Sequence, residues 1–156
     1  CPMNVNTWKV EAKDQWAKMP TADDVALADP GELAMLEGSV IAVADTGGIV
    51  FLREAEEKLE FIARLDTWGD APDQSFGKEI RIAADGPDLV VADTERHRIL
   101  WFDAESRKLN GQLGETDTPG DALGLFNRPT CLGLCGERLA VFDSGNQRVV
   151  KALLIR

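Results

Sequence analysis

The chain has 156 residues, and its 27 Asp and Glu against 17 Lys and Arg give a formal net charge of −10 at pH 7. Nucleic acids are bound by clustered positive charge, so this balance argues against DNA or RNA as a partner. With 44% hydrophobic and 28% charged residues, the composition is that of a folded globular domain. No apolar run reaches the ~20 residues that a membrane helix needs.

The sequence begins at Cys1. Excision from a longer chain leaves such a residue, and so does removal of a bacterial lipoprotein signal. The second origin would place the protein outside the cytoplasm, and the compartment is otherwise open.

Two further thiols, Cys131 and Cys135, lie in a segment typical of a strand. Four strand steps of ~3.3 Å put their Cα atoms ~13 Å apart, beyond the ~7 Å limit for a disulfide. The one histidine lies elsewhere in the sequence. We therefore expect two buried thiols that neither bridge each other nor bind a metal.

Three stretches of the chain align without gaps. They are residues 31–46, 79–94 and 129–144, with glycines at 38, 86 and 136 and aspartates at 45, 93 and 143. Both markers give spacings of 48 and 50 residues. Phe76 and Phe126 each lie 17 residues before their aspartate, where the first repeat has Ala28.

Each repeat consists of short apolar runs separated by turn residues, a pattern that predicts antiparallel strands. The expected strands are 33–36, 40–45, 48–53 and 59–64, then 80–84, 89–93, 99–102 and 109–113, then 131–134, 139–143 and 149–155. Four short strands in a unit of this length predict a β-propeller blade. We expect residues 31–156 to be nearly all β, in blades spanning 31–75, 76–125 and an incomplete 126–156.

The third repeat lacks a fourth strand, and an unpaired sheet edge is usually covered. Residues 1–30 form a separate N-terminal segment, in which 5–10 is a candidate outer blade strand and 11–19 is either a short helix or a loop.

Residues 91–103, and residues 126–129 together with 141–149, resemble the NHL repeat. That family has Phe and Pro at the blade entrance and an apolar-Asp-Thr/Ser-x-Asn-x-Arg-apolar turn. The third repeat matches well, the second has Arg96 in place of the asparagine, and the first lacks both Asn and Arg in Thr46–Gly48. The resemblance implies an NHL-type β-propeller, commonly six-bladed. RNA binding, known for some NHL proteins, is disfavoured by the charge.

Closed propellers have 4–8 blades, and this chain has length for about three. We expect half a ring with two raw terminal faces, completed either by another chain in an oligomer or larger assembly or by further blades.

The turns 46–48, 94–98 and 144–148 and the connections 65–75 and 114–123 should share one face of the ring, where loops on a rigid scaffold carry binding. The candidate binding residues are Trp68, Asp70, Arg96, His97, Arg98, Asp121 and Arg148. Arg96, His97 and Arg148 are expected to point outward. Trp68 either packs between blades or contacts a partner.

Asp45, Asp93 and Asp143 are predicted structural turn residues, which accept hydrogen bonds from the turn or pair with an arginine five residues on, Arg98 or Arg148. The acidic loop residues Asp66, Asp70, Asp73, Glu115, Asp117 and Asp121 either bind calcium or are simply solvated. They match no EF-hand spacing.

The sequence favours a non-enzymatic binding or scaffold module with a protein partner and no cofactor. It has a single histidine, His97, and neither a Gly-x-Ser-x-Gly elbow nor a Walker loop. The alternative is part of a propeller enzyme, a metal-dependent lyase or hydrolase with its site on the ring axis. Such enzymes of the resembled family use several histidines or carboxylates there.

Overall fold

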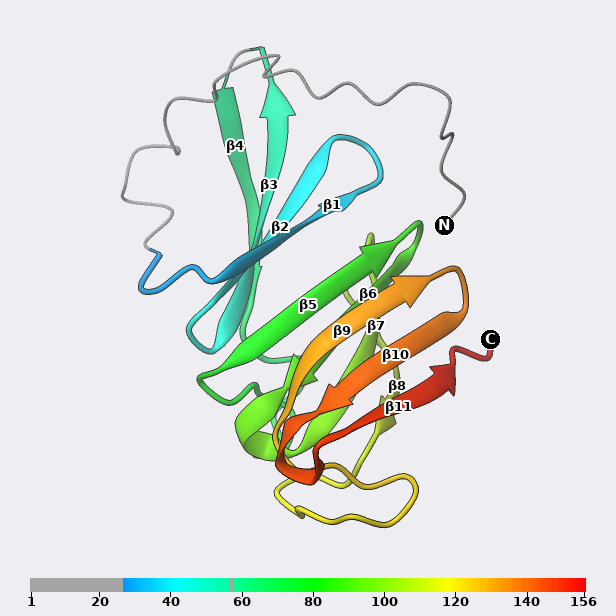
Figure 1. Ribbon diagram of the computed structural model, residues 1–156. Helices are drawn as coiled ribbons and strands as arrows, with labels where there is room; N and C mark the ends of the chain where they lie inside the picture. The colour runs from blue at the N-terminus through cyan, green and yellow to red at the C-terminus, as the bar shows by residue number, and fades with distance from the viewer. Residues whose placement is uncertain (1–26, 57) are drawn as a thin grey trace.

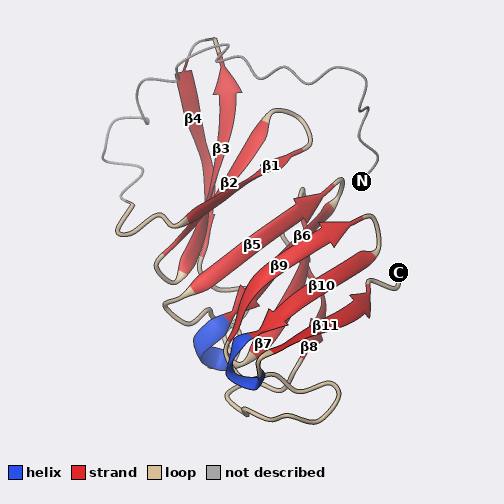
Figure 2. Cartoon of the chain, viewed as in Figure 1, coloured by secondary structure: helices blue, strands red, loops and turns tan. Residues whose placement is uncertain are grey.

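The computed structural model describes residues 27–56 and 58–156, which fold into three antiparallel β-sheets (Figure 1). The prediction of an all-β fold is confirmed. The helical elements within this part of the chain are two three-residue 3₁₀ turns, η1 (Thr94–Arg96) and η2 (Ser144–Asn146), each between the second and third strands of a sheet (Figure 2). The candidate strand 5–10 and the segment 11–19 lie outside the described residues.

Each sheet is a meander in which consecutive strands are neighbours. Blade 1 consists of β1 (Glu32–Leu36), β2 (Val40–Asp45), β3 (Gly48–Ala55) and β4 (Lys58–Leu65). Blade 2 consists of β5 (Ile80–Asp85), β6 (Asp88–Asp93), β7 (Arg98–Asp103) and β8 (Leu109–Leu113). Blade 3 consists of β9 (Pro129–Cys135), β10 (Arg138–Asp143) and β11 (Arg148–Leu153), without a fourth strand among the described residues. These sheets have the form of propeller blades.

Blade 2 lies between the other two blades, and its strand β6 is buried along its whole length. Leu89 and Val91 pack in the core shared with blade 1, whereas Val90 and Ala92 pack in the core shared with blade 3. The strand needs an unbroken apolar run because both of its faces are covered. In blade 3, strand β10 alternates instead between exposed and buried residues.

The phenylalanine at the entrance of blades 2 and 3 packs in the core between that blade and the one before it. Phe76 belongs to the core between blades 1 and 2, and Phe126, only 1% exposed, to the core between blades 2 and 3. The repeated phenylalanine therefore joins neighbouring blades.

The first hairpin of blade 1 differs in register from its counterparts. Leu36 pairs with Val40 in blade 1, but Asp85 pairs with Asp88 in blade 2. The loop of blade 1 is thus one residue longer, and a one-residue shift moves every side chain of a strand to the other face. The ungapped sequence alignment did not reveal this change. It places Ala34 and Ile82 at the same repeat position, but Ala34 faces blade 2, the following blade, whereas Ile82 faces blade 1, the preceding blade.

The prediction of two buried thiols is wrong. Cys131 is exposed and Cys135 is half-buried, although the two do not bridge each other, as expected. Cys131 lies opposite Phe142 on the side of blade 3 that faces away from blade 2. No described segment covers that side, so a strand that would be internal in a longer stack is exposed here.

Only one of the two expected raw faces is open. On the side of blade 1 away from blade 2, a separate core of Ile41, Val43, Val50, Leu52 and Leu59 is buried, with Leu27 packed against it. On the corresponding side of blade 3, Phe142 is 42% and Val149 63% exposed.

In the described part of the chain, no helix has the length and apolar character required to cross a membrane.

We predict that Phe126→Ala lowers the free energy of unfolding by about 3–5 kcal/mol, because it removes a buried ring and leaves a cavity between blades 2 and 3. Urea denaturation followed by circular dichroism measures this change. Leu123→Ala, at a side chain that is 93% exposed, is the control and should shift the midpoint little. Equal midpoints for the two variants would contradict the role of Phe126.

Candidate functional site

The geometry that the three turns share arises from strand register. The aspartate that ends the second strand of each blade faces the first residue of the third strand: Asp93 faces Arg98, Asp143 faces Arg148 and Asp45 faces Gly48. An arginine in that place lies beside the carboxylate, so the pairing follows from the hairpin itself.

In blade 2 this pair is fully buried, with Arg98 1% exposed and Asp93 0% exposed. Arg98 Nε donates to Asp93 Oδ2 at 2.9 Å, and the backbone N–H of Gly77 donates to Oδ1 at 2.9 Å. The other guanidinium nitrogens donate to the carbonyls of Asp73 and Ser75, each at 2.7 Å. The pair thus ties the connection from blade 1 to the turn of blade 2.

Blade 3 repeats this arrangement in a more exposed setting. Arg148 Nε donates to Asp143 Oδ2 at 2.9 Å, and the Asn127 N–H donates to Oδ1 at 2.7 Å. Arg148 also donates to the carbonyls of Asp121 and Leu125, each at 2.7 Å. In both blades a backbone amide from the connection 16 residues upstream reaches the carboxylate. In blade 3 the turn also contributes, as predicted, because the side-chain amide of Asn146 donates to Asp143 Oδ2 at 2.7 Å.

Blade 1 completes the same arrangement with an arginine from another strand. Arg64, near the end of β4, donates through Nη1 to Asp45 Oδ2 at 3.0 Å. Gly48 makes this possible, because a Cβ there would crowd the Arg64 guanidinium. The Ala28 and Asp29 amides donate to the same carboxylate. Sequence analysis missed Arg64, and its only signal was the glycine in the arginine position.

The electrostatics of Asp45 reflect these partners. Burial raises the pKa of its carboxyl, but the hydrogen bonds from Ala28, Asp29 and Arg64 outweigh that effect and hold the pKa at about 2, below the ordinary value of 3.8. Asp93 shows the opposite balance. Its deeper burial raises the pKa despite the bonds from Arg98 and Gly77.

The expectation that Arg96 and Arg148 point outward is corrected by these contacts. Arg96 donates to both oxygens of Asp117 at 3.0 Å and to the Ser75 carbonyl at 2.7 Å, and the Asp117 carboxylate raises the pKa of Arg96. A ligand reaching Arg96, Arg98 or Arg148 would have to displace the carbonyls and carboxylates of the loops.

The remaining candidate binding residues differ in accessibility. Trp68 packs between blades, with its ring 4.8 Å from that of Phe76 and the Arg98 guanidinium 5.3 Å from its centroid. His97 has a left-handed backbone, with φ of 59°, and accepts a hydrogen bond at Nδ1 from the backbone of Arg128. Asp70 and Asp121 are exposed. A binding role for these residues stays a prediction.

The calcium interpretation finds no support in the described residues, which bring no three His, Cys, Asp or Glu side chains close enough to hold a metal ion. Two of the loop carboxylates have partners: Asp66 pairs with Arg64 and Asp117 with Arg96.

A second candidate surface is the side of blade 3 that faces away from blade 2, which we call the open face. It consists of Cys131, Arg138, Ala140, Phe142, Val149 and Lys151, all exposed. In register, Phe142 lies between Cys131 and Val149, and Ala140 beside Lys151. The residues at the equivalent positions of blade 2, Ala92 and Ile99, are buried in the core shared with blade 3. Sequence analysis expected raw faces but named no residue on them.

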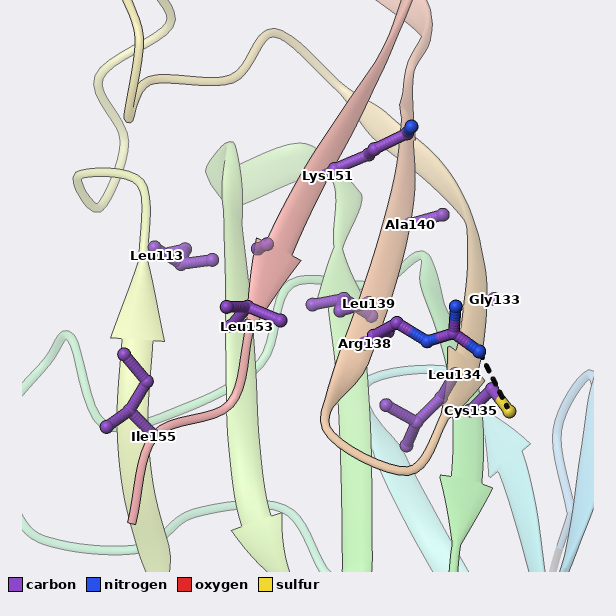
Figure 3. A pocket seen from close by; sticks show the side chains of 11 residues that line it. Leu113, Gly133, Leu134, Cys135, Arg138, Leu139, Ala140, Lys151, Leu153 and Ile155 are labelled. Atoms are coloured by element: carbon purple, nitrogen blue, oxygen red, sulfur yellow. Dashed lines mark hydrogen bonds between the residues drawn. The ribbon is translucent and has the colours of Figure 1, made fainter. Parts of the chain in front are cut away.

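An apolar pocket of about 760 Å³ lies along the same end of blade 3. Figure 3 shows Leu113 of β8 and Ile155 beyond β11 at its rim, with Lys151, Arg138 and Cys135 on the neighbouring strands. Leu113 is half-buried, whereas its counterpart Leu65 in blade 1 is only 7% exposed. Among the described residues, blade 3 has no fourth strand beside β11, so no strand of that blade fills this space.

No protein-family model matches the chain, and no curated protein matches its sequence. One similar solved structure is a chain in a crystal structure of a mitotic checkpoint complex, with a TM-score of 0.47 and 15% identity over 90% of this chain and 40% of that one. Another is a chain of hydrazine synthase from Kuenenia stuttgartiensis, with a TM-score of 0.42 and 15% identity over 84% of this chain and 37% of that one. This chain therefore spans about two fifths of either protein. The assignment of propeller blades rests on the three sheets themselves.

We predict that Asp93→Ala lowers the free energy of unfolding by about 3–5 kcal/mol, because it strands the buried Arg98 guanidinium. Asp143→Ala should cost less, about 1–3 kcal/mol, because the Arg148 side chain is 30% exposed and water can solvate it. Urea denaturation compares the two, with Asp70→Ala as an exposed control. If Asp143→Ala proved the more damaging change, burial would not be what sets the strength of these pairs.

The low pKa of Asp45 predicts a pH-dependent contribution to stability. Because folding depresses this pKa, the contribution is complete above about pH 4 and is lost as pH falls toward about 2. The difference in unfolding free energy between wild type and Asp45→Asn should therefore shrink across that window. Asp70→Asn controls for the change in net charge, and a difference that stayed constant down to pH ~2 would refute the assignment.

Proposed function

We propose that this protein is a non-enzymatic binding or scaffold module that associates with protein through the open face of blade 3. The observation that carries the proposal is the contrast between equivalent positions. Ile99 of blade 2 is 2% exposed beneath blade 3, whereas Val149 at the same place in blade 3 is 63% exposed. A contiguous exposed apolar surface on a stable scaffold marks an interaction site.

The chemistry of the open face supports protein over other ligands. Its side chains form a sheet surface with alternate residues turned outward, which matches another sheet or a flat protein surface. Its charged members, Lys151 and Arg138, lie in the next two rows of the face beyond the apolar row of Cys131, Phe142 and Val149. Aromatic residues and arginine are both enriched in protein interfaces.

The non-enzymatic part of the proposal rests on the state of the ionisable groups. The buried carboxylates Asp93 and Asp143 are each bonded to an arginine and to a backbone amide. Carboxylates bonded in this way hold the loops in place, which supports a structural role. A metal-dependent lyase or hydrolase with its site on the ring axis remains the alternative function.

We also propose that the blades are of the NHL type. The support is the entrance phenylalanine together with the Asp–Arg pair around the second turn, which the structure contains in blades 2 and 3. Blade 1, with Arg64 in place of the turn arginine, departs from that pattern.

Photo-crosslinking tests the proposed surface. A photoreactive phenylalanine analogue replaces Phe142 in the full chain expressed in its source organism, and a matched chain carries the analogue at Leu123. We expect a specific protein adduct at position 142 and none at position 123, because Leu123 is a loop residue that is 93% exposed but isolated. Mass spectrometry then identifies the adduct.

Absence of an adduct at position 142, or equal yields at both positions, would contradict the proposed function. Loss of a defined catalytic activity on mutation of Asp93 or Asp143, with unchanged thermal stability, would instead favour the enzymatic alternative.

A further inference from the structure

We infer that the open face of blade 3 docks a propeller blade of a partner protein, and that this blade carries a carboxylate where blade 3 carries Arg156. The inference rests on the proposed function and adds the kind of partner. It follows from the interface between blades 2 and 3. Strands β6 and β7 of blade 2 have the same register as β10 and β11 of blade 3, so each residue facing blade 3 has an equivalent on the open face.

The apolar part of the internal interface shows what covers such a face. Ile99 of blade 2 lies in one core with the entrance phenylalanine of blade 3, Phe126, and with Leu132 of its first strand, β9. Val149 is the residue of blade 3 equivalent to Ile99, and it is 63% exposed. The first strand and entrance of a further blade are therefore the elements that fit over Val149.

Hydrogen bonds also join the second turn of one blade to the entrance of the next. Thr94 Oγ1 donates to the carbonyl of Pro129 at 2.7 Å, and the backbone N–H of Arg128 donates to His97 Nδ1 at 3.1 Å. In blade 1, the N–H of Gly47 donates to a carbonyl at the entrance of blade 2. Both internal interfaces thus use the turn to hold the backbone of the following blade.

Blade 3 presents equivalent groups in its own turn. Ser144 has the position of Thr94, and Gln147 has that of His97, with a similar left-handed backbone at φ of 49° against 59°. Ser144 is half-buried and Gln147 is exposed, and neither side chain bonds to another described residue. A serine hydroxyl donates as a threonine hydroxyl does, and an amide oxygen accepts as an imidazole nitrogen does. The turn is therefore equipped to bond the entrance of a further blade.

Charge narrows the kind of blade that fits. On blade 2, Asp88 pairs with Arg156, which lies just beyond β11 and has its guanidinium over the ring of Trp101. Blade 3 has Arg138 in the position of Asp88 and Lys151 in the position of Trp101. Neither cation forms an ion pair within the described part of the chain. A blade docked in the same geometry places its equivalent of Arg156 beside these two cations, where a carboxylate is attracted and an arginine is repelled.

Mapped photo-crosslinking tests the contact in the full chain, expressed in its source organism. The photoreactive phenylalanine analogue replaces Phe142 in one chain, Gln147 in a second and Leu123 in the control chain, and mass spectrometry sequences the crosslinked peptides. We expect position 142 to crosslink to the first strand of a propeller blade in another protein. Position 147 should crosslink to the residues directly before that strand, because His97 bonds the backbone there in blade 3.

Charge reversal tests the carboxylate. In the chain with the analogue at position 142, Arg138→Glu together with Lys151→Glu should lower the adduct yield at least about 10-fold. The matched control is Arg53→Glu together with Lys108→Glu, at exposed cations of blades 1 and 2, which should leave the yield nearly unchanged. Circular dichroism verifies that each chain folds. If the reversed chain does not fold, Arg138→Gln with Lys151→Gln replaces it, and we expect a loss of about 5-fold.

The outcomes separate this inference from the proposed function. Adducts with a segment that is not a propeller blade, or with a second copy of this chain, would overturn the inference and leave the proposed function standing. An adduct at position 142 with none at position 147 would overturn the docking geometry. A yield that falls no further in the reversed chain than in its matched control would overturn the carboxylate. No adduct at position 142 removes both the inference and the function.

Discussion

A propeller blade is a sheet with two apolar faces, and each face must be removed from water. Strand β6 shows the constraint in its complete form, because its residues are buried alternately against blade 1 and against blade 3. Burial of apolar surface contributes about 25 cal/mol per Å², so each blade is stabilised by the neighbour that covers its face. The entrance phenylalanines, the arginine pairs and the exposure of blade 3 are all consequences of stacking the sheets.

Stacking in turn requires that each connection cross from one sheet to the next without leaving polar groups unpaired. The chain meets this requirement with an aspartate that accepts the amide of the connection and an arginine that donates to its carbonyls. In blades 2 and 3 the arginine begins the third strand, as Arg98 and Arg148. In blade 1 it comes from the fourth strand, as Arg64. These arginines, which the sequence indicated as candidate binding residues, therefore hold the loops in place instead.

The same constraint makes a sheet face, rather than the loops, the more accessible surface for a partner. The loop arginines donate hydrogen bonds to other groups of this chain. The loop side chains that are exposed to a partner are therefore mainly scattered carboxylates such as Asp70 and Asp121. The open face instead combines exposed Phe142 and Val149 with the cations Arg138 and Lys151 on an otherwise acidic molecule. Apolar area together with complementary charge is what gives an interface both affinity and specificity.

Local patterning in the sequence determined the strands, the three-blade repeat and the Asp–Arg pairs across the second turn of blades 2 and 3. These features depend on residues within a few positions of one another or on alternation along one strand, so the sequence contains them directly. Three things were decided only by tertiary structure. Arg64 reaches Asp45 from 19 residues away because Gly48 leaves room. Strand β1 turns Leu33 and Met35 to the other face because its hairpin is one residue longer. Cys131 is exposed because no described segment packs on the open face of blade 3. In each case the outcome depends on which segments meet in space, and burial and pairing between distant segments leave no periodic trace in the chain.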